Sequence, residues 1–107
     1  MLEITYDRSV EPTRLCLTGS LTIYEVGEAH TTLLSMLATP EARPCLLDLE
    51  ALEDLDTAGA QLLLATQRHF EAAGGTLKVQ GPAAAVTEVL ELLRLETLYP
   101  DVLLAHR

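Results

Sequence analysis

The stretch Cys45-Leu46-Leu47-Asp48-Leu49 decides the fold class, because it is an apolar run with one acid, Asp48, at its end before Leu49. Such a run is typical of a strand covered on both faces. Downstream, Asp56-Thr57-Ala58-Gly59 supplies a helix start, and Gly74-Gly75 stops that helix. The inward stripe of the helix consists of Leu62, Leu63, Thr66 and Phe70. Thr76–Gln80 then alternates as another strand, so a helix links two strands that we expect to be parallel neighbours.

The residues before this unit predict a hairpin and a first helix. Leu2–Tyr6 and Thr13–Thr18 both alternate apolar and polar side chains, with polar turn residues between them. Thr22-Ile23-Tyr24-Glu25 has the pattern of a capping box, in which the Thr22 hydroxyl accepts from the Glu25 amide and the Glu25 carboxylate accepts from the Thr22 amide. The inner stripe of the helix that follows, which should end near Ala38, consists of Val26, Ala29, His30, Leu33 and Leu37.

The residues after Gln80 predict a third helix. Gly81-Pro82 opens it, with the proline in the first turn, where its missing N–H costs nothing. Its apolar face consists of Val86, Val89, Leu90 and Leu93. Tyr99–Ala105 fits either a short edge strand or a last helical turn. The chain therefore predicts an α/β sandwich that begins with a hairpin and has a core of Leu, Val and Ala.

Composition and charge exclude several classes of protein. The 107 residues suit one domain spanning 1–107, and 49% hydrophobic residues indicate an ordinary globular chain. A net charge of −9 disfavours binding to nucleic acid or to anionic membranes. We find neither an apolar run long enough to insert into a membrane nor a secretory signal. Cys16 and Cys45 form no disulfide framework, so we expect a soluble cytoplasmic protein with reduced thiols.

Catalytic motifs are absent from the sequence. It has no GxSxG, GxxxxGK[ST], GxGxxG or HExxH pattern. His30, His69 and His106 are too scattered to pair with a nucleophile or a metal, and the place of His30 on the inner stripe favours a packed, hydrogen-bonded side chain. We therefore expect no enzymatic activity, no catalytic residue, no cofactor and no bound metal.

The stretch Asp48–Asp56 contains five acids between a strand and a helix. One interpretation is a Mg²⁺ site, because hard cations prefer carboxylate oxygens. A phosphoacceptor receiver domain would need paired acids after its first strand, whereas Tyr6-Asp7-Arg8 offers one, and Lys78 lies in mid-strand. The second interpretation is a solvated loop that presents the helix start to a partner. Exposure to solvent is sufficient to explain the acids at Glu50 and Glu53.

The helix start itself offers a binding surface. Thr57 is a candidate helix cap. A phosphate on its hydroxyl would be tolerated by the free amides of a helix N-terminus, and it would add about two negative charges beside Asp54 and Asp56. Gly59 allows close approach of another backbone, either from a partner or from the sheet.

Four sets of residues make the whole chain resemble a STAS domain, the fold of bacterial anti-sigma factor antagonists. They are Leu17-Thr18-Gly19-Ser20-Leu21-Thr22, Leu46-Leu47-Asp48-Leu49, Asp56-Thr57-Ala58-Gly59 with Leu62-Leu63, and Gly74-Gly75-Thr76-Leu77 with Val89-Leu90-Glu91-Leu92-Leu93. The resemblance implies a mixed sheet of four to five strands, in the element order ββαβαβα with a short tail. It also implies helices packed mainly on one face.

The resemblance implies a partner as well. Unphosphorylated partner-switching members bind a GHKL-type serine kinase that doubles as an anti-sigma factor, and phosphorylation of the second hydroxyl residue of a D-S-S-G type motif breaks the complex. That position is Ala58, which has no hydroxyl, whereas the first position is Thr57. Either Thr57 is the phosphoacceptor or the chain binds constitutively. The implied partner-binding residues are Ser20, Thr22, Tyr24, Asp54, Asp56, Thr57, Ala58, Gly59 and Ala60.

Two other pathways fit the same motif. The D-T-small-G variant resembles the STAS subunit of the Mla phospholipid-transport ABC complex, which docks on the ABC ATPase. Free-standing STAS proteins of this type also accompany chemosensory systems. Some STAS domains bind GTP or ATP, although no residue here requires a nucleotide. The leading interpretation is a non-catalytic regulatory binding module, present as a monomer or a weak homodimer.

Overall fold

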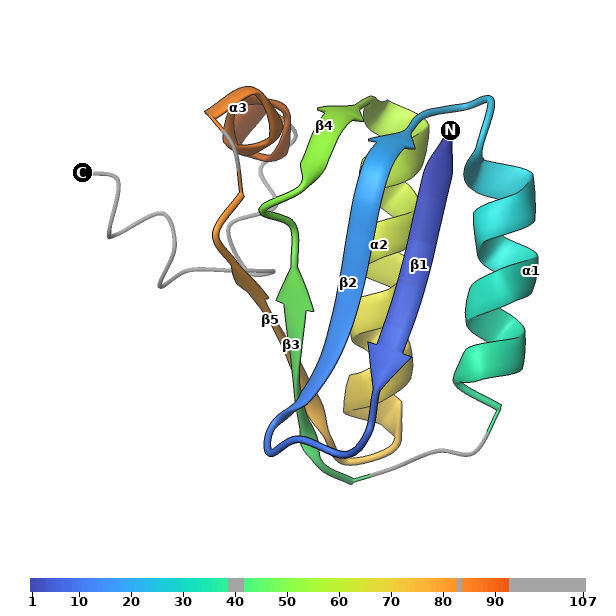
Figure 1. Ribbon diagram of the computed structural model, residues 1–107, viewed down its shortest axis with the longest axis vertical. Helices are drawn as coiled ribbons and strands as arrows, with labels where there is room; N and C mark the ends of the chain where they lie inside the picture. The colour runs from blue at the N-terminus through green and yellow to red at the C-terminus, as the bar shows by residue number, and fades with distance from the viewer. Residues whose placement is uncertain (39–41, 83, 93–107) are drawn as a thin grey trace.

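The computed structural model of the chain describes residues 1–38, 42–82 and 84–92. Within them lie five strands and three helices (Figure 1). They are β1 (Leu2–Asp7), β2 (Thr13–Leu21), α1 (Val26–Met36), β3 (Pro44–Asp48), β4 (Leu52–Leu55), α2 (Thr57–Ala72), β5 (Thr76–Gln80) and α3 (Ala84–Leu92). The predictions for Leu93 and for Tyr99–Ala105 fall outside these residues. None of the helices in the described ranges has the length and apolarity needed to cross a membrane.

The strands form one mixed sheet in the order β1-β2-β3-β5, with β4 paired to β2. The predicted hairpin is confirmed, because β1 and β2 are antiparallel, with Leu2 opposite Gly19 and Asp7 opposite Arg14. The predicted parallel pair is also confirmed, since β3 runs parallel to β5. β2 has two successive parallel partners: β3 pairs with Thr13–Cys16, and β4 pairs with Gly19–Leu21. The β2–β4 pairing has a shift of register between Gly19, which lies opposite Leu52, and Ser20, which lies opposite Asp54.

The helices α1 and α2 lie against the sheet on one side, as Figure 1 shows, and α3 packs on β4. The sequence predicts that β3 is covered on both faces, and this prediction is wrong. Cys45 and Leu47 are buried on the helix side, whereas Leu46 and Asp48 on the other side are only half-buried. Asp48 forms an ion pair with Arg14 on that outer face, at 3.6 Å.

The core between the sheet and the helices is mostly leucine, as the composition predicts. Its largest fully buried side chains are Leu15, Leu17, Leu21, Leu47, Leu49, Leu52, Leu63, Leu77, Leu90 and Val86. The predicted stripe of α2 is confirmed, because Leu62, Leu63, Thr66 and Phe70 are all buried. α2 ends where the glycine pair predicts: Gly74 has φ +86°, and the Gly75 amide donates to the Phe70 carbonyl (2.9 Å).

Strand β4 corrects the predicted order of elements, because the sequence treats residues 48–56 as an acidic loop. Leu52 and Leu55 point into the core, and Glu53 and Asp54 between them are exposed. Ser20 and Leu21 of β2 lie opposite Asp54 and Leu55. The observed order is therefore ββαββαβα, and the strand that the pattern misses leads directly into α2.

Two helix starts also differ from the prediction. α1 begins at Val26, and the residue before it, Glu25, makes no side-chain capping bond. α1 ends at Met36, two residues before the expected position. α3 begins at Ala84, so Pro82 precedes the helix and is buried. On α3, Val86 and Leu90 are fully buried and Val89 is half-buried, as its apolar face predicts.

Candidate functional site

The candidate site lies where the turn after β2 meets the first turn of α2. One carboxylate joins the two segments. Asp56 Oδ1 accepts from the Gly59 amide (2.9 Å), and Asp56 Oδ2 accepts from the Ile23 amide (2.8 Å). The backbone of the turn is therefore held against the N-terminus of α2. In this way the structure brings together the two segments, Ser20–Tyr24 and Asp54–Ala60, that contain the expected partner-binding residues.

Asp56 caps α2, and the prediction that Thr57 is the cap is wrong. Asp56 has an extended backbone (φ −117°, ψ −174°), whereas Thr57 is the first helical residue. The carboxylate of Asp56 already accepts from the Gly59 amide, which is the bond that a capping hydroxyl would otherwise make. The Thr57 side chain is exposed, and the helix cap does not need it because Asp56 provides the cap.

Gly59 and Ala60 lie beneath the site rather than on its surface. Both are buried, and Ala60 has an exposed fraction of 0%. A Cβ atom on Gly59 would overlap the carbonyl oxygen of Leu21 and approach Leu55 Cδ1 at 2.8 Å. Glycine therefore lets the helix rest directly on β2. Gly59 and Ala60 support the site from inside and present no side chain to a partner.

The Thr22–Glu25 turn is only half of the predicted capping box. The Glu25 carboxylate accepts from the Thr22 amide (2.9 Å), as expected. The Thr22 hydroxyl, however, donates to the same carboxylate oxygen (2.6 Å) and accepts from the Tyr24 amide (3.3 Å), instead of accepting from the Glu25 amide. The Glu25 amide donates to the Thr22 carbonyl (2.9 Å). The four residues thus form a separate turn, and the helix begins after it.

The hydrogen bonds from Thr22 lower the pKa of Glu25 below its ordinary value of 4.5, and the nearby Met1 ammonium (3.3 Å) lowers this pKa further. A carboxyl group whose pKa is lower in the folded state stabilises the fold at pH values above its unfolded-state pKa. This stabilisation is lost as the pH falls through its folded-state pKa. We therefore expect Glu25→Gln to lower the free energy of unfolding at pH 7, and the gap from wild type to narrow below pH 4.5. Urea unfolding at pH 7 and at pH 3.5 measures both gaps.

The control for Glu25→Gln is Glu88→Gln, which removes the same charge from an exposed position on α3. It should change the free energy of unfolding by less than about 0.5 kcal/mol at pH 7. If the gap between Glu25→Gln and wild type were the same at both pH values, the Thr22 contacts would not be supporting the charged carboxylate.

The exposed surface of the site is apolar at one edge and acidic at the other. Ile23 is 64% exposed and Tyr24 is 92% exposed. Thr57 is exposed beside them on α2, and Glu53 and Asp54 are exposed on β4. The sequence pattern places Ile23 inside a capping box and does not predict its exposure at the surface. A large apolar residue next to a tyrosine in a polar turn was the available signal.

Three further expected site residues, Ser20, Thr22 and Ala58, are half-buried at the margins of this surface. Ser20 donates its amide to the Met1 carbonyl (2.8 Å) and lies opposite Asp54 in the sheet. The expectation that His30 is packed inside is wrong, because its side chain is exposed and lines a hollow between α1 and α2. Within the described part of the chain, no three His, Cys, Asp or Glu side chains are arranged to hold a metal ion.

The two bonds of Asp56 can be separated by mutation. Asp56→Asn keeps an oxygen for the Gly59 amide but turns an NH₂ group toward the Ile23 amide, so it should release the turn and largely keep the cap. Asp56→Ala removes both bonds and should lower the free energy of unfolding by about 1–2 kcal/mol. Thr57→Ala, which removes no cap, is the control. Thermal unfolding measures stability, and NMR chemical shifts of the Ile23 and Gly59 amides report the two bonds.

Comparison with known proteins agrees with the sequence motifs. The family model described as Mlab, STAS domain matches residues 4–104. The chain belongs to the STAS domain family. This confirms the resemblance seen in the sequence over nearly all of the chain. No curated protein matches the chain significantly in sequence.

Solved structures of anti-sigma factor antagonists share the fold. The unphosphorylated form of SpoIIAA is 18% identical with a TM-score of 0.73, covering 91% of this chain and 85% of that chain. An anti-sigma factor antagonist from Mycobacterium paratuberculosis is 17% identical with a TM-score of 0.78, covering 94% and 84%. The phosphorylated form of the Bacillus cell fate determinant SpoIIAA is 19% identical with a TM-score of 0.61, covering 91% and 88%. At these identities the likeness shows the fold alone.

Proposed function

We propose that this STAS domain is a non-catalytic regulatory module that binds a protein partner through the turn after β2 and the first turn of α2. The observation that carries the proposal is the Asp56 carboxylate, which holds the exposed Ile23–Tyr24 pair next to the exposed Thr57. Exposed apolar and aromatic side chains on a rigid support suit a protein interface. The direct contacts are Ile23, Tyr24, Asp54 and Thr57, with Ser20, Thr22 and Ala58 at the margin.

The proposed partner is a GHKL-type serine kinase that also acts as an anti-sigma factor. Two of the similar structures are anti-sigma factor antagonists, and SpoIIAA is described in both unphosphorylated and phosphorylated forms. By this analogy, the unmodified chain binds the kinase and so releases a sigma factor in the cytoplasm. The acidic edge of the site, at Glu53 and Asp54, would face basic residues of the kinase.

Phosphorylation of Thr57 is the proposed switch that ends binding. Thr57 is exposed and is the hydroxyl residue of the Asp56–Gly59 motif, because Ala58 has none. A phosphate would add about two negative charges beside Asp54 and Asp56. The Asp56 carboxylate already accepts from the Gly59 amide. A phosphate on Thr57 would therefore lie at a helix N-terminus that already has an anionic cap. Repulsion and bulk at the interface would then dominate its effect.

A second candidate function is an accessory subunit of an ABC-type phospholipid transporter. It is favoured by the matched family, whose description names Mlab, and by the Thr57-Ala58 pair in place of two hydroxyl residues. Under this alternative the same surface docks on the transporter ATPase and Thr57 stays unmodified. A chemosensory system is a third setting for the same surface, and it has no separate support in the structure.

The test of the surface is a charge placed at Thr57. We expect Thr57→Glu to weaken capture of the partner at least about tenfold, and Thr57→Ser to retain it, because serine keeps the hydroxyl and adds neither charge nor bulk. The control is Thr76→Glu, which adds the same charge to an exposed threonine on β5, beyond the other end of α2. Partner capture is quantified by mass spectrometry after affinity purification from the native host. Equal capture by Thr57→Glu and Thr76→Glu would contradict the proposed site.

The same purification distinguishes the two pathways. Recovery of a serine kinase of the GHKL type, with phosphate on a fraction of Thr57, supports the sigma-factor switch. Recovery of an ABC ATPase with its permease, with Thr57 unmodified, supports the role as a transporter subunit and overturns the proposed sigma-factor switch. Loss of whichever partner is recovered in the Thr57→Glu variant ties that partner to this surface.

A further inference from the structure

Strand β1 lies at one edge of the sheet. Among the strands in the described ranges, β2 is the one that pairs with it, in an unbroken register from Leu2 opposite Gly19 to Asp7 opposite Arg14. In an antiparallel pair, alternate residues direct their N–H and C=O groups toward the partner strand, and the others direct theirs away from it. β1 therefore presents a row of backbone donors and acceptors outward, and such a row can pair with another extended segment.

A groove lies beside this edge, between β1 and α1. Its volume is about 300 Å³, and its lining consists of Met1, Leu2, Ile4, Tyr24, Glu25, Glu28, Ala29 and Thr32. Figure 1 shows α1 alongside β1 at this edge of the sheet, so the groove lies next to the position that a strand added to β1 would occupy. Leu2 and Ile4 are half-buried on the helix side of β1, and Ala29, which is 2% exposed, forms the floor.

The charges around the groove are mainly negative. The Met1 ammonium pairs with Glu25 (3.3 Å), whereas Glu28 is exposed and has no ion-pair partner among the described residues. On the opposite face of β1, the Glu3 side chain is exposed. Neither β1 nor α1 contains a Lys or an Arg. Because the backbone edge is flanked by acids on both faces, it is complementary to a segment with basic side chains.

The same charges argue against a second copy of this chain as the occupant. Its β1 would bring Glu3 and Asp7 to the edge, and like charges on neighbouring strands are destabilising. Each copy also has a net charge of −9. Arg8 and Arg14 lie at the Asp7 end of β1, away from the groove, and Arg14 is already paired with Asp48 (3.6 Å).

We infer that the β1 edge is a docking site for an extended segment of a partner protein that alternates basic and apolar side chains. The segment adds a strand beside β1. Its apolar side chains enter the groove against Leu2 and Ile4, and its basic side chains lie on the other face, beside Glu3. This inference goes beyond the proposed function and does not depend on it, although Tyr24 lies at the boundary between the two surfaces.

The test titrates the intact chain with the peptide acetyl-Lys-Val-Lys-Val-Lys-Val-amide. We expect saturable NMR shifts of the Glu3, Ile4 and Thr5 amides, and hydrogen exchange at least about tenfold slower at alternate residues of β1. Two control peptides separate alternation from charge. Acetyl-Lys-Lys-Lys-Val-Val-Val-amide keeps the composition and charge, and acetyl-Glu-Val-Glu-Val-Glu-Val-amide keeps the alternation. Both should bind at least about tenfold more weakly.

Two N-methylated versions of the first peptide test backbone pairing. One version carries methyl groups on the amide nitrogens of its lysines, and the other carries them on those of its valines. Alternate amides of an added strand face β1, so one version should lose binding and the other should retain it. Retention by both versions, or loss by both, would overturn the inference. Slower exchange at β1 that depends on chain concentration without peptide would assign the edge to a second copy and overturn it as well.

Matched variants locate the binding. Thr32→Phe fills the groove, whereas Thr31→Phe adds the same ring to the neighbouring exposed residue of α1, outside the groove. Glu3→Lys reverses a charge at the edge, whereas Glu88→Lys makes the same change at an exposed position of α3. Thr32→Phe and Glu3→Lys should weaken binding of the lysine–valine peptide at least about tenfold, and the two controls should retain it. Wild-type affinity in Thr32→Phe or in Glu3→Lys would overturn the inference.

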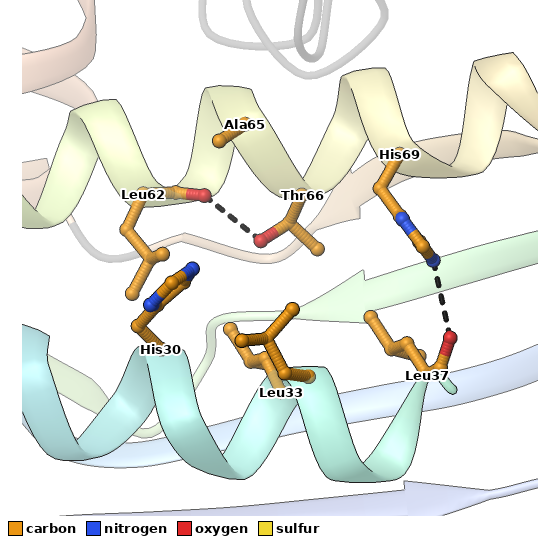
Figure 2. A pocket seen from close by; sticks show the side chains of 8 residues that line it. His30, Leu33, Leu37, Leu62, Ala65, Thr66 and His69 are labelled. Carbon is orange, nitrogen blue, oxygen red and sulfur yellow. Dashed lines mark hydrogen bonds between the residues drawn. The ribbon is translucent and has the colours of Figure 1, made fainter.

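Two further measurements separate this edge from the other surfaces of the chain. The Leu62 methyls line a hollow between α1 and α2 (Figure 2), and they should not shift when the peptide binds. Thr57→Glu, which is expected to weaken capture of the proposed partner, should leave peptide binding unchanged. Failure of peptide binding at β1 is therefore distinguishable from failure of the proposed function.

Discussion

We expect Gly59→Ala to lower the free energy of unfolding by about 3 kcal/mol, the upper part of the range for overpacked buried positions. The added methyl would overlap the Leu21 carbonyl oxygen of β2 and lie 2.8 Å from Leu55 Cδ1. The Leu55 side chain can rotate away, but the carbonyl belongs to a sheet strand that pairs with β4 at this point. The helix must therefore lift from the sheet, and every residue of its first turn moves with it.

The same substitution has a functional consequence. Asp56 accepts from the Gly59 amide and from the Ile23 amide, so a displaced first turn also disturbs the exposed turn that carries Ile23 and Tyr24. We expect partner capture by Gly59→Ala to fall even under conditions in which the variant is folded.

Gly27→Ala is the matched control for Gly59→Ala. Gly27 is also helical, near the start of α1, but a Cβ there would meet no atom within 4 Å. Alanine is favoured over glycine in helices by up to about 1 kcal/mol, so Gly27→Ala should leave stability unchanged or raise it. Urea unfolding of both variants measures the difference. If Gly59→Ala were as stable as Gly27→Ala, the close packing of α2 on β2 would be wrong.

The elements that the sequence predicts well are those whose own residues carry a clear period. The β1–β2 hairpin alternates strictly, and α2 places Leu62, Leu63, Thr66 and Phe70 on one side before a glycine stop. For these segments the local pattern and the tertiary environment agree. The Asp56–Gly59 motif indicated the candidate site through its resemblance to the STAS signature, because its local pattern alone indicates only a helix start.

Strand β4 was missed because its own residues give no strand signal. Leu52-Glu53-Asp54-Leu55 does not alternate, and Glu and Asp are poor strand formers. It is a strand because β2 extends beyond its pairing with β3, and the backbone of Gly19–Leu21 is there to pair with it. The link between Asp56 and Ile23 joins residues 33 positions apart and has no local pattern either. The site's location could be predicted from the sequence, but the bonds that assemble it could not.

The local sequence also does not determine whether Asp56 or Thr57 caps α2. Both side chains accept hydrogen bonds well at a helix start, so the sequence does not rank them. In the structure Asp56 is the cap, because its two carboxylate oxygens accept from the Ile23 and Gly59 amides. Thr57 is the first residue of the helix itself. Thr57 is thereby left on the surface, which is what the proposed switch requires.

We expect Leu90→Ala to lower the free energy of unfolding by about 2–5 kcal/mol, the range for truncating a buried leucine. Leu90 has an exposed fraction of 0%, one turn after the fully buried Val86, on the face of α3 that packs on β4. β4 leads directly into the Asp56 cap, so a cavity under α3 also weakens the support of the candidate site.

Leu92→Ala is the control that isolates burial, because Leu92 lies on the same helix and is 81% exposed. Both variants remove the same atoms, and leucine and alanine differ little in helix propensity, so the difference between the variants reports mainly transfer from water and the cavity left behind. Leu92→Ala should stay within about 0.5 kcal/mol of wild type in urea unfolding. Equal effects of the two substitutions would mean that α3 does not pack on β4 in solution. Leu52 and Leu55 of β4 would then lack the cover that α3 gives them. Glu53 and Asp54, which lie between these leucines, would lose their fixed position in the site.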